Sequence, residues 1–247
     1  MLSGKTRRSH WRTMVGSVQA SPPSPGAALA TGLAVFDLDR TLVRGSSLAR
    51  LARSLAEARL VRRTELAGHL VRDAVFAARG LGPAAIDRLR TSLLHAAAGV
   101  DQAPLLDVVG RIAPAIAADV YPGARWLLER HLHDGHRVVL LSSSPQELVA
   151  AVAAALDSTI TAVGTVAEVV EGRYTGLLAG PFCHGAGKLT RLEQTLGRCD
   201  LHDATAYADS ASDLPVLRAC GTAVAVNPDR GLRDAAVAAG WPILHFG

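Results

Sequence analysis

The sequence has few aromatic residues, few cysteines and no long hydrophobic run. Aromatic residues make up 4% of the 247 positions and hydrophobic residues 49%, so a buried core must consist mainly of Ala, Val and Leu. No stretch approaches the roughly 20 apolar residues that a membrane-spanning helix requires. We therefore expect a soluble protein without stable membrane insertion, long enough for one large domain or for a core that carries a smaller one.

The three cysteines, Cys183, Cys199 and Cys220, are an odd number without paired spacing. Free thiols in a reducing cytoplasm are the simpler interpretation, and we expect a cytoplasmic protein. Cys183 and His184 could form half of a metal site, but the sequence contains no matching second half.

Acidic residues are missing from the start of the chain. None occurs before Asp37, and four basic residues before Met14 account for the net charge of +4, which leaves 22 basic and 22 acidic residues in the rest. A nucleic-acid-binding domain would carry its basic patch on a folded face. The high isoelectric point therefore belongs to the tail, and we expect no nucleic-acid partner.

Composition divides the first half of the chain into a tail and a helical segment. Residues 1–31 combine an Arg-rich start with a Pro- and Ser-rich stretch, a composition typical of disorder. Order is predicted to begin at Leu33 with a short apolar run that ends at Asp37 and suits a buried parallel strand. Amphipathic helices that suit a small bundle are expected at 46–59, 64–79, 83–98 and 101–119, the last with Asp101 as its N-cap.

Beyond Tyr121, predicted helices alternate with predicted strands. Helices are expected at 122–133, 145–156, 188–196, around 214 and at 232–239, and strands at 137–141, 204–208, 223–226 and 243–246. The stretches 163–170 and 173–178 are predicted to form a hairpin, and Ser144 and Glu147 have the spacing of a capping box. The sequence thus predicts an α/β fold with a Rossmann-like parallel sheet. Residues 32–42 and 120–247 would form the core, and 43–119 an inserted helical cap.

Polar side chains stand at the predicted carboxyl ends of three strands and at one helix start. They are Asp37 and Asp39 after the first strand, Ser142 after the second, Asp209 and Asp213 after a later one, and Lys188 at the start of a helix. Because ligands bind beyond the carboxyl ends of parallel strands, we expect these groups to converge at one edge of the sheet. By contrast, the histidines of 131–136 are interpreted as an exposed turn rather than a zinc site.

In this order the motifs resemble the haloacid dehalogenase superfamily, and more closely its phosphoserine-phosphatase-like branch, which carries a helical cap after the first strand. The most specific parts of the resemblance are Tyr-Ala-Asp-Ser-Ala-Ser-Asp-Leu-Pro at 207–215, Val-Ala-Val-Asn-Pro-Asp at 224–229 and Gly-Trp-Pro at 240–242. The resemblance covers residues 33–246 and excludes the tail.

The resemblance implies a Mg²⁺-dependent phosphatase that hydrolyses a small phosphomonoester through an aspartyl-phosphate intermediate. Asp37 would be the nucleophile, and Asp39 would protonate the leaving alcohol and later activate water. Crowding by other carboxylates would raise the pKa of Asp39. Ser142 would donate a hydrogen bond to a phosphoryl oxygen, and Lys188 would neutralise the phosphate and the nucleophile together.

The residue types agree with this chemistry. Phosphoryl transfer is catalysed mainly by positioning and charge neutralisation, and carboxylates repel phosphate unless a cation lies between them. Mg²⁺ prefers oxygen ligands in an octahedron. Its protein ligands would be Asp37, the backbone carbonyl of Asp39 and Asp209, with Asp213 behind them or bound through water.

Weaker substrate contacts are predicted at Arg40, Ser46, Ser143 and Gly187, and the cap is expected to close over the site and to determine specificity. Between residues 43 and 118 the chain carries eleven Arg and six acidic residues. This charge hints at a second anionic group on the substrate, although a solvated Arg-rich surface explains it equally well. Phosphoserine phosphatases usually have a glutamate nine residues after the nucleophile. Ser46 takes that position here, which argues against phosphoserine as the main substrate.

Two alternatives remain open. The aspartyl-phosphate could be transferred to an acceptor alcohol, which would make the chain a phosphotransferase. The chain could also be a non-catalytic regulatory protein that retains the fold, although no catalytic position is lost. The expected partner is a small phosphorylated metabolite, and the sequence determines neither its identity nor the oligomeric state.

Overall fold

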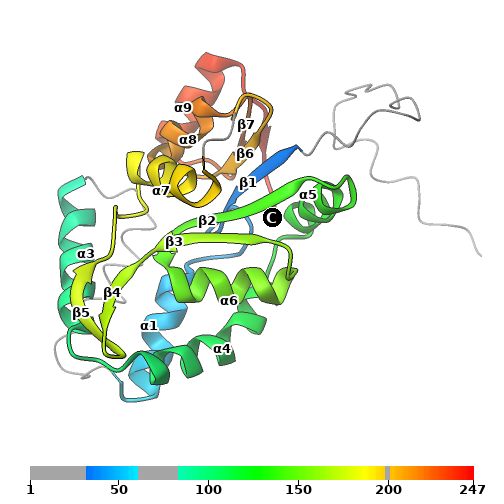
Figure 1. Cartoon of the computed structure of the whole chain (residues 1–247). Helices are drawn as coiled ribbons and strands as arrows, with labels where there is room; N and C mark the ends of the chain where they lie inside the picture. Colours follow the sequence, from blue (N-terminus) through cyan, green and yellow to red (C-terminus); the bar gives the residue numbers. More distant parts are fainter. Residues whose placement is uncertain (1–31, 61–82, 198–200) are drawn as a thin grey trace, which may run out of the picture. The chain divides into compact units, whose positions relative to one another are not determined.

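A parallel six-stranded sheet lies at the centre of the molecule. The computed structural model describes residues 32–60, 83–197 and 201–247, and of residues 83–89 only the backbone. The strands are β1 (Leu33–Asp37), β2 (Arg137–Pro145), β3 (Thr161–Thr165), β6 (Thr205–Ala208), β7 (Thr222–Val226) and β8 (Ile243–Leu244). Their order in space is β3-β2-β1-β6-β7-β8, and every neighbouring pair is parallel (Figure 1). The strands that follow β1 are thus placed first on one side of it (β2 and β3) and later on the other (β6, β7 and β8). The carboxyl end of β1 is therefore a topological switch point.

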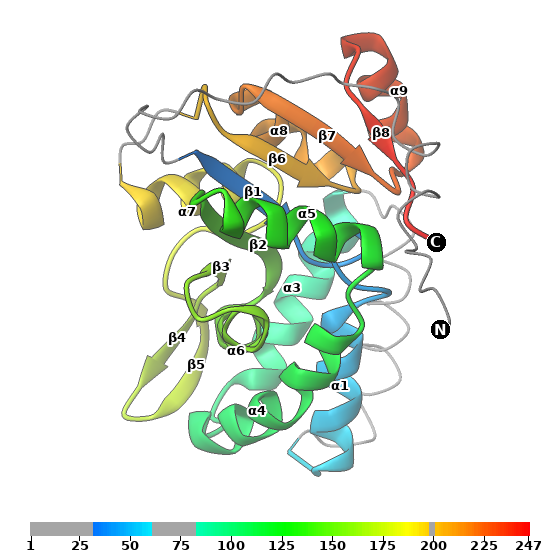
Figure 2. The same cartoon turned by 90° about the vertical axis from the view of Figure 1, so that its right-hand side faces the viewer.

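Helices cover both faces of this sheet (Figure 2). They are α5 (Pro122–His133) and α6 (Gln146–Leu156) on one face, and α7 (Ala186–Leu196), α8 (Leu214–Ala219) and α9 (Arg230–Ala239) on the other. Successive residues of β1 point to opposite faces, so Phe36 packs in the core under α5 and α6 and Val35 in the core under α7 and α8. The predicted α/β fold with a Rossmann-like sheet is confirmed.

Within the described residues, three helices of the insertion and a hairpin lie beside the sheet. The helices are α1 (Ser47–Glu57), α3 (Pro83–Ala97) and α4 (Gln102–Ala118). The chain enters and leaves this region through adjacent segments, since Arg44 N donates to Asp119 O at 3.3 Å and Tyr121 N to Leu42 O at 2.9 Å. The cap boundaries given at 43 and 119 remain a prediction. The helix expected at 64–79, the expected tail and Cys199 lie outside the described residues.

The hairpin differs from its prediction. The expected strand at 163–170 is two strands, because β3 pairs with β2 in the main sheet and only β4 (Ala167–Val170) pairs with β5 (Arg173–Leu178). Glu171 and Gly172 at the turn have φ values of 49° and 77°, which suit a tight hairpin. Gln102 N donates to Gly172 O at 2.9 Å. The hairpin is thus attached to the inserted helices, although the sequence boundaries assign it to the core.

Two predicted helix caps are replaced by longer-range contacts. Pro145 occupies the N-cap position of α6, and no side chain caps that helix. The capping box predicted from Ser144 and Glu147 is therefore wrong: β2 continues through Ser144, and Glu147 accepts a hydrogen bond of 2.8 Å from the Tyr174 hydroxyl. Asp101 stands at the N-cap position of α4 but makes no capping hydrogen bond. Its carboxylate pairs with an Arg173 nitrogen at 3.1 Å.

The stretch 131–136 is exposed only in part: residues 133–135 are exposed as predicted, whereas His131 belongs to the last turn of α5. His131 is half-buried, with its Nδ1 2.7 Å from His136 Nδ1 and its Nε2 2.8 Å from the Tyr207 hydroxyl. Its ring meets Phe36 edge-on. Burial, followed by the charge of His136, lowers the His131 pKa to about 4.

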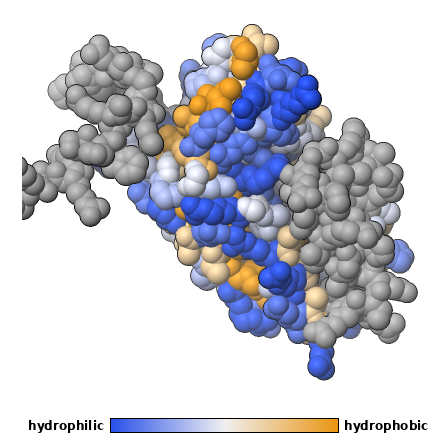
Figure 3. Space-filling model, turned by 180° about the vertical axis from the view of Figure 1, so that it is seen from behind, coloured by the Kyte–Doolittle hydropathy of each residue, from blue (hydrophilic) through white to orange (hydrophobic). Residues whose placement is uncertain are grey.

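The described surface in Figure 3 is mostly hydrophilic and carries small hydrophobic patches. The large hydrophobic residues that the described chain exposes are Leu106, Trp126, Val170, Leu177 and Val237. Within the described ranges, no helix has the length and apolar character needed to cross a membrane. Cys183 is a buried free thiol, as expected, and Cys220 is buried as well.

Candidate active site

Asp37 is the last residue of β1, and a tight loop follows it. The loop folds back on itself because Leu42 N and Val43 N both donate to Leu38 O at 3.0 Å. Arg40 has a φ of 61°, a left-handed conformation that is uncommon outside glycine. Thr41 Oγ1 donates to Asp37 Oδ2 at 3.2 Å. The loop thus orients the buried Asp37 carboxylate at the carboxyl end of the central strand.

Three buried carboxylates meet at this edge of the sheet. Asp37, Asp209 after β6 and Asp213 in the short 3-10 helix η1 (Ala211–Asp213) each offer an oxygen, and these oxygens lie within 4.8 Å of one another. All three residues are at most 8% exposed. Such a group of oxygen atoms suits a hard divalent cation such as Mg²⁺.

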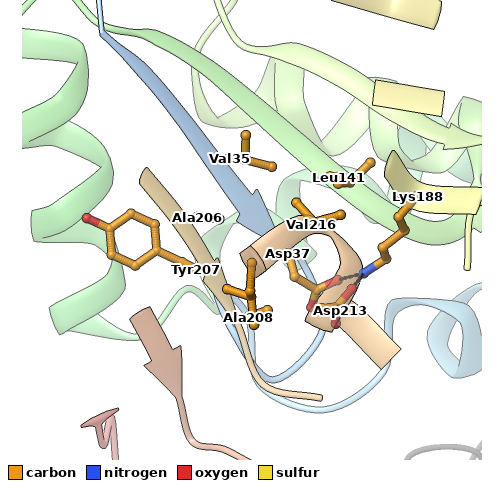
Figure 4. Close-up of a pocket in the computed structure, with 10 residues that line it drawn as sticks. Val35, Asp37, Leu141, Lys188, Ala206, Tyr207, Ala208, Asp213 and Val216 are labelled. Atoms are coloured by element: carbon orange, nitrogen blue, oxygen red, sulfur yellow. Dashed lines mark hydrogen bonds and ion pairs between the residues drawn. The ribbon is translucent and has the colours of Figure 1, made fainter. Parts of the chain in front are cut away.

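Lys188 lies beside the carboxylates and is itself 3% exposed. Its Nζ is 2.6 Å from Asp37 Oδ1 and 2.5 Å from Asp213 Oδ1 (Figure 4). Burial alone would lower the Lys188 pKa, but the charges of Asp213 and Asp37 outweigh burial and raise it. The ammonium group therefore stays charged between the two carboxylates. Figure 4 shows this group at one end of a small pocket lined mainly by apolar side chains, including Val35 and Val216.

Asp209 is paired with a cation although it accepts no hydrogen bond. Its Oδ2 is buried and accepts no hydrogen bond from the described part of the chain, although Arg40 Nη2 lies 2.6 Å away. Burial and the charge of Asp37 raise the Asp209 pKa well above its usual value. The charge of Arg40 opposes this rise in pKa, so the oxygen that accepts no hydrogen bond already has a cationic partner. The chemistry of the three carboxylates, which are hard oxygen donors, fits a bound Mg²⁺, and Arg40 forms an ion pair with one of these predicted metal ligands.

Asp39 is held by the inserted helices. Its Oδ1 accepts a hydrogen bond of 2.8 Å from Ser47 N, the first residue of α1. The pKa of Asp39 is raised to about 6, chiefly by burial and further by the charge of Asp37, against the lowering effect of the Ser47 bond. The predicted direction agrees with this value, but removal from water contributes more than crowding by carboxylates. A carboxyl with such a pKa can hold a proton near neutral pH.

Three serines follow one another at the end of β2. Ser142 Oγ accepts a hydrogen bond of 3.2 Å from Ser144 N, which leaves its own hydrogen free to be donated. Ser143 Oγ lies 3.3 Å from His184 Nδ1. Ser144 Oγ lies 2.9 Å from Ser47 Oγ. The strand end thus carries hydroxyls toward the loop before α7 and toward α1.

The remaining predicted substrate contacts have local structural roles. Ser46 is the N-cap of α1, and its hydroxyl accepts a hydrogen bond of 3.2 Å from Ala49 N. A Cβ atom at Gly187 would lie 1.9 Å from Phe182 O. Packing of the loop before α7 therefore requires a glycine there, independently of any substrate.

The sequence did not identify two positioning residues near the carboxylates. Asp229 caps α9 through Leu232 N and accepts hydrogen bonds from Ser210 Oγ and Ala211 N at 3.1 Å, so it holds the loop between Asp209 and Asp213. Asn227 Nδ2 donates to Arg40 O at 3.0 Å. Both residues lie in the quoted motif at 224–229, which was the signal that could have found them.

Comparisons with known proteins agree with this geometry. The model of the haloacid dehalogenase-like hydrolase family matches residues 34–218. A phosphoserine phosphatase of Mycobacterium tuberculosis is 38% identical over 220 residues, which cover 87% of this chain and 71% of the relative. A probable phosphatase of the same species is 35% identical over 233 residues, covering 92% of this chain and 80% of the relative.

Solved structures show the same fold. A Bordetella pertussis protein of unknown function has a TM-score of 0.72 at 26% identity, covering 87% of this chain and 99% of that chain. A phosphoserine phosphatase in its apo form has a TM-score of 0.56 at 17% identity, covering 83% and 90%. The family match spans most of the sheet and includes Asp37, Lys188, Asp209 and Asp213. The chain belongs to the haloacid dehalogenase-like hydrolases.

Proposed function

We propose that this hydrolase is a phosphatase that cleaves a small phosphate monoester in two steps, with Asp37 as the nucleophile. The observation that supports the proposal most is the buried contact between Lys188 Nζ and Asp37 Oδ1 at 2.6 Å within the carboxylate cluster. Relatives named as phosphatases support the same reaction class.

In the first step an Asp37 oxygen attacks phosphorus, the bond from phosphorus to the leaving oxygen breaks, and Asp39 gives its proton to that oxygen. In the second step Asp39 takes a proton from water, the water oxygen attacks the aspartyl-phosphate, and inorganic phosphate leaves a free Asp37. The Asp39 pKa of about 6 suits a group that is protonated in one step and basic in the next.

The positive charges of Mg²⁺ and Lys188 would balance the negative charges of the phosphate and the carboxylates. Mg²⁺ would be held by Asp37, Asp209 and the backbone carbonyl of Asp39, with Asp213 behind them, and when bound it supplies positive charge to the phosphoryl oxygens. Lys188 orients and neutralises the nucleophile. Ser142, whose hydroxyl hydrogen is free, donates to a phosphoryl oxygen.

The inserted helices form a cap that excludes water from the site, with the crossings near Arg44 and Asp119 as its hinge. The cap includes the β4–β5 hairpin, because Gly99 N donates to Tyr174 O at 2.8 Å and the Asp101 carboxylate pairs with Arg173. The substrate is a small phosphorylated metabolite. Phosphoserine is the first compound to test because of the relative's name, and Ser46 predicts that it is a poor substrate.

The test uses 4-nitrophenyl phosphate with Mg²⁺, with chelator, and with Asp37→Asn. We expect hydrolysis that needs Mg²⁺ and is lost in Asp37→Asn. Asp234→Asn removes an exposed carboxylate on α9 and should leave the rate unchanged. Full activity in Asp37→Asn would remove the nucleophile assignment, and a wild-type protein inactive on a panel of phosphate esters would favour a non-catalytic role. Transfer of phosphate to added alcohols would favour a phosphotransferase.

A further inference from the structure

Three consecutive hydrogen bonds connect Asp39 to Ser142 through the first residue of α1. Asp39 Oδ1 accepts from Ser47 N at 2.8 Å, Ser47 Oγ lies 2.9 Å from Ser144 Oγ, and Ser144 N donates to Ser142 Oγ at 3.2 Å. Ser47 is 0% and Ser144 3% exposed. The contacts therefore run through a region without bulk water, from the loop after β1 to the end of β2.

Local structure explains why these two serines are available. Ser47 is the first residue of α1, so its N–H has no partner within the helix and can donate to a carboxylate, which the partial positive charge of the helix start also favours. The hydroxyl of Ser46 caps the helix, which leaves the hydroxyl of Ser47 for a contact outside it. Ser144 does not cap α6, so its hydroxyl is available to Ser47.

We infer that Ser47 and Ser144 are positioning residues. Their hydroxyl pair connects the cap helix α1 to the core strand β2, and it fixes the position of the acid Asp39 relative to the phosphate-binding Ser142. Breaking the pair leaves a buried hydroxyl without a partner, which costs more than a solvated hydrogen bond would. The pair forms only when α1 is seated on the end of β2. It therefore couples the position of the cap to the position of both catalytic groups. This inference rests on the proposed function.

A purely stabilising hydroxyl pair would behave differently. Loss of stability lowers the amount of folded enzyme and affects every substrate equally. Misplacement of Asp39 affects the step in which the leaving group is protonated. The resulting loss of rate therefore depends on how much the leaving oxygen needs a proton. An alkyl phosphate has a basic leaving oxygen, whereas 4-nitrophenolate leaves readily without protonation.

The experiment measures kcat and KM of Ser47→Ala, Ser144→Ala and the double variant with an alkyl phosphate and with 4-nitrophenyl phosphate. We expect kcat to fall about tenfold or more on the alkyl phosphate and about threefold or less on the aryl phosphate, with KM within about twofold of wild type. Both substitutions remove the hydroxyl pair, and Ser47→Ala also removes the interaction of the Ser47 side chain with Asp39, so the double variant should fall little further than Ser47→Ala. Thr195→Ala, which removes an exposed hydroxyl on α7, should retain wild-type kcat.

The outcomes separate this inference from the proposed function. An active wild type that loses activity in Asp37→Asn, but whose serine variants keep kcat or lose it equally on both substrates, overturns the inference alone. Additive losses in the double variant overturn it as well. If Ser47→Ala does not fold, Ser144→Ala removes the hydroxyl pair alone and decides the question. An inactive wild type overturns both proposals.

Discussion

Replacing Lys188 with methionine should lower the free energy of unfolding and abolish turnover, because this side chain is the charge partner of two buried carboxylates. Its Nζ lies 2.6 Å from Asp37 Oδ1 and 2.5 Å from Asp213 Oδ1. At an effective dielectric constant of about 20, each contact corresponds to roughly 6 kcal/mol of Coulomb attraction. Desolvation offsets most of this, since burial costs several kcal/mol per ion. Removing one partner of such a group typically destabilises a protein by about 3–5 kcal/mol.

The loss in Lys188→Met should depend on pH. Burial raises the pKa of Asp213 to about 6, while the Lys188 charge acts to lower it, so methionine should raise this pKa further. A carboxyl whose folded-state pKa exceeds its unfolded value binds more protons in the folded state, and its penalty is relieved as pH falls through the folded pKa. The variant should therefore regain stability relative to wild type between about pH 7.5 and pH 5.5.

Urea unfolding followed by circular dichroism at both pH values, in chelator, measures this effect. Lys188→Arg keeps the positive charge and should lose less stability than Lys188→Met at pH 7.5. Wild-type stability in Lys188→Met at both pH values would refute the electrostatic argument for the cluster.

Three further predictions concern single substitutions. Asp209→Asn should raise the Mg²⁺ concentration needed for half-maximal activity by roughly tenfold or more, and an unchanged Mg²⁺ titration would contradict its role as a ligand. Gly187→Ala should destabilise the fold by about 3 kcal/mol because the new Cβ meets Phe182 O at 1.9 Å, and an unaltered thermal midpoint would exclude this packing. The pKa of His131 is lowered to about 4 by burial and His136, so its contribution to stability is complete above about pH 6.5 and is lost as pH falls to about 4. The thermal midpoint of His131→Gln should fall less than that of wild type between pH 7 and pH 5, and parallel curves would speak against the shift.

The sequence predicted the sheet and the gathering of acidic groups with little error. Asp37 and Asp209 end predicted parallel strands, and the carboxyl ends of parallel strands share one edge. The structure has their oxygens, with one from Asp213, within 4.8 Å of one another. The spacing of apolar residues and the turn-forming residues were sufficient to predict the strands, because these strands are short apolar runs bounded by polar residues.

Pairing partners and long-range side-chain contacts were not predictable in this way. Residues 163–170 have one continuous strand-like composition, yet they divide between the main sheet and a hairpin. The spacing of Ser144 and Glu147 suits a capping box, yet each side chain bonds to an element far away in the sequence. A local sequence pattern does not show which group elsewhere in the chain will form a hydrogen bond with a polar side chain.

The sequence alone thus determined the kind of fold, the family and the residue types at the strand ends, because these depend on periodicity and on motifs within a few positions. Tertiary structure decided how the groups are held. Ser47 and Ser144 are 97 positions apart, and they meet only when α1 docks on the end of β2. The raised pKa values of Asp39 and Asp209 likewise arise chiefly from burial, because the exclusion of water depends on the whole packed molecule and not on any stretch of the chain.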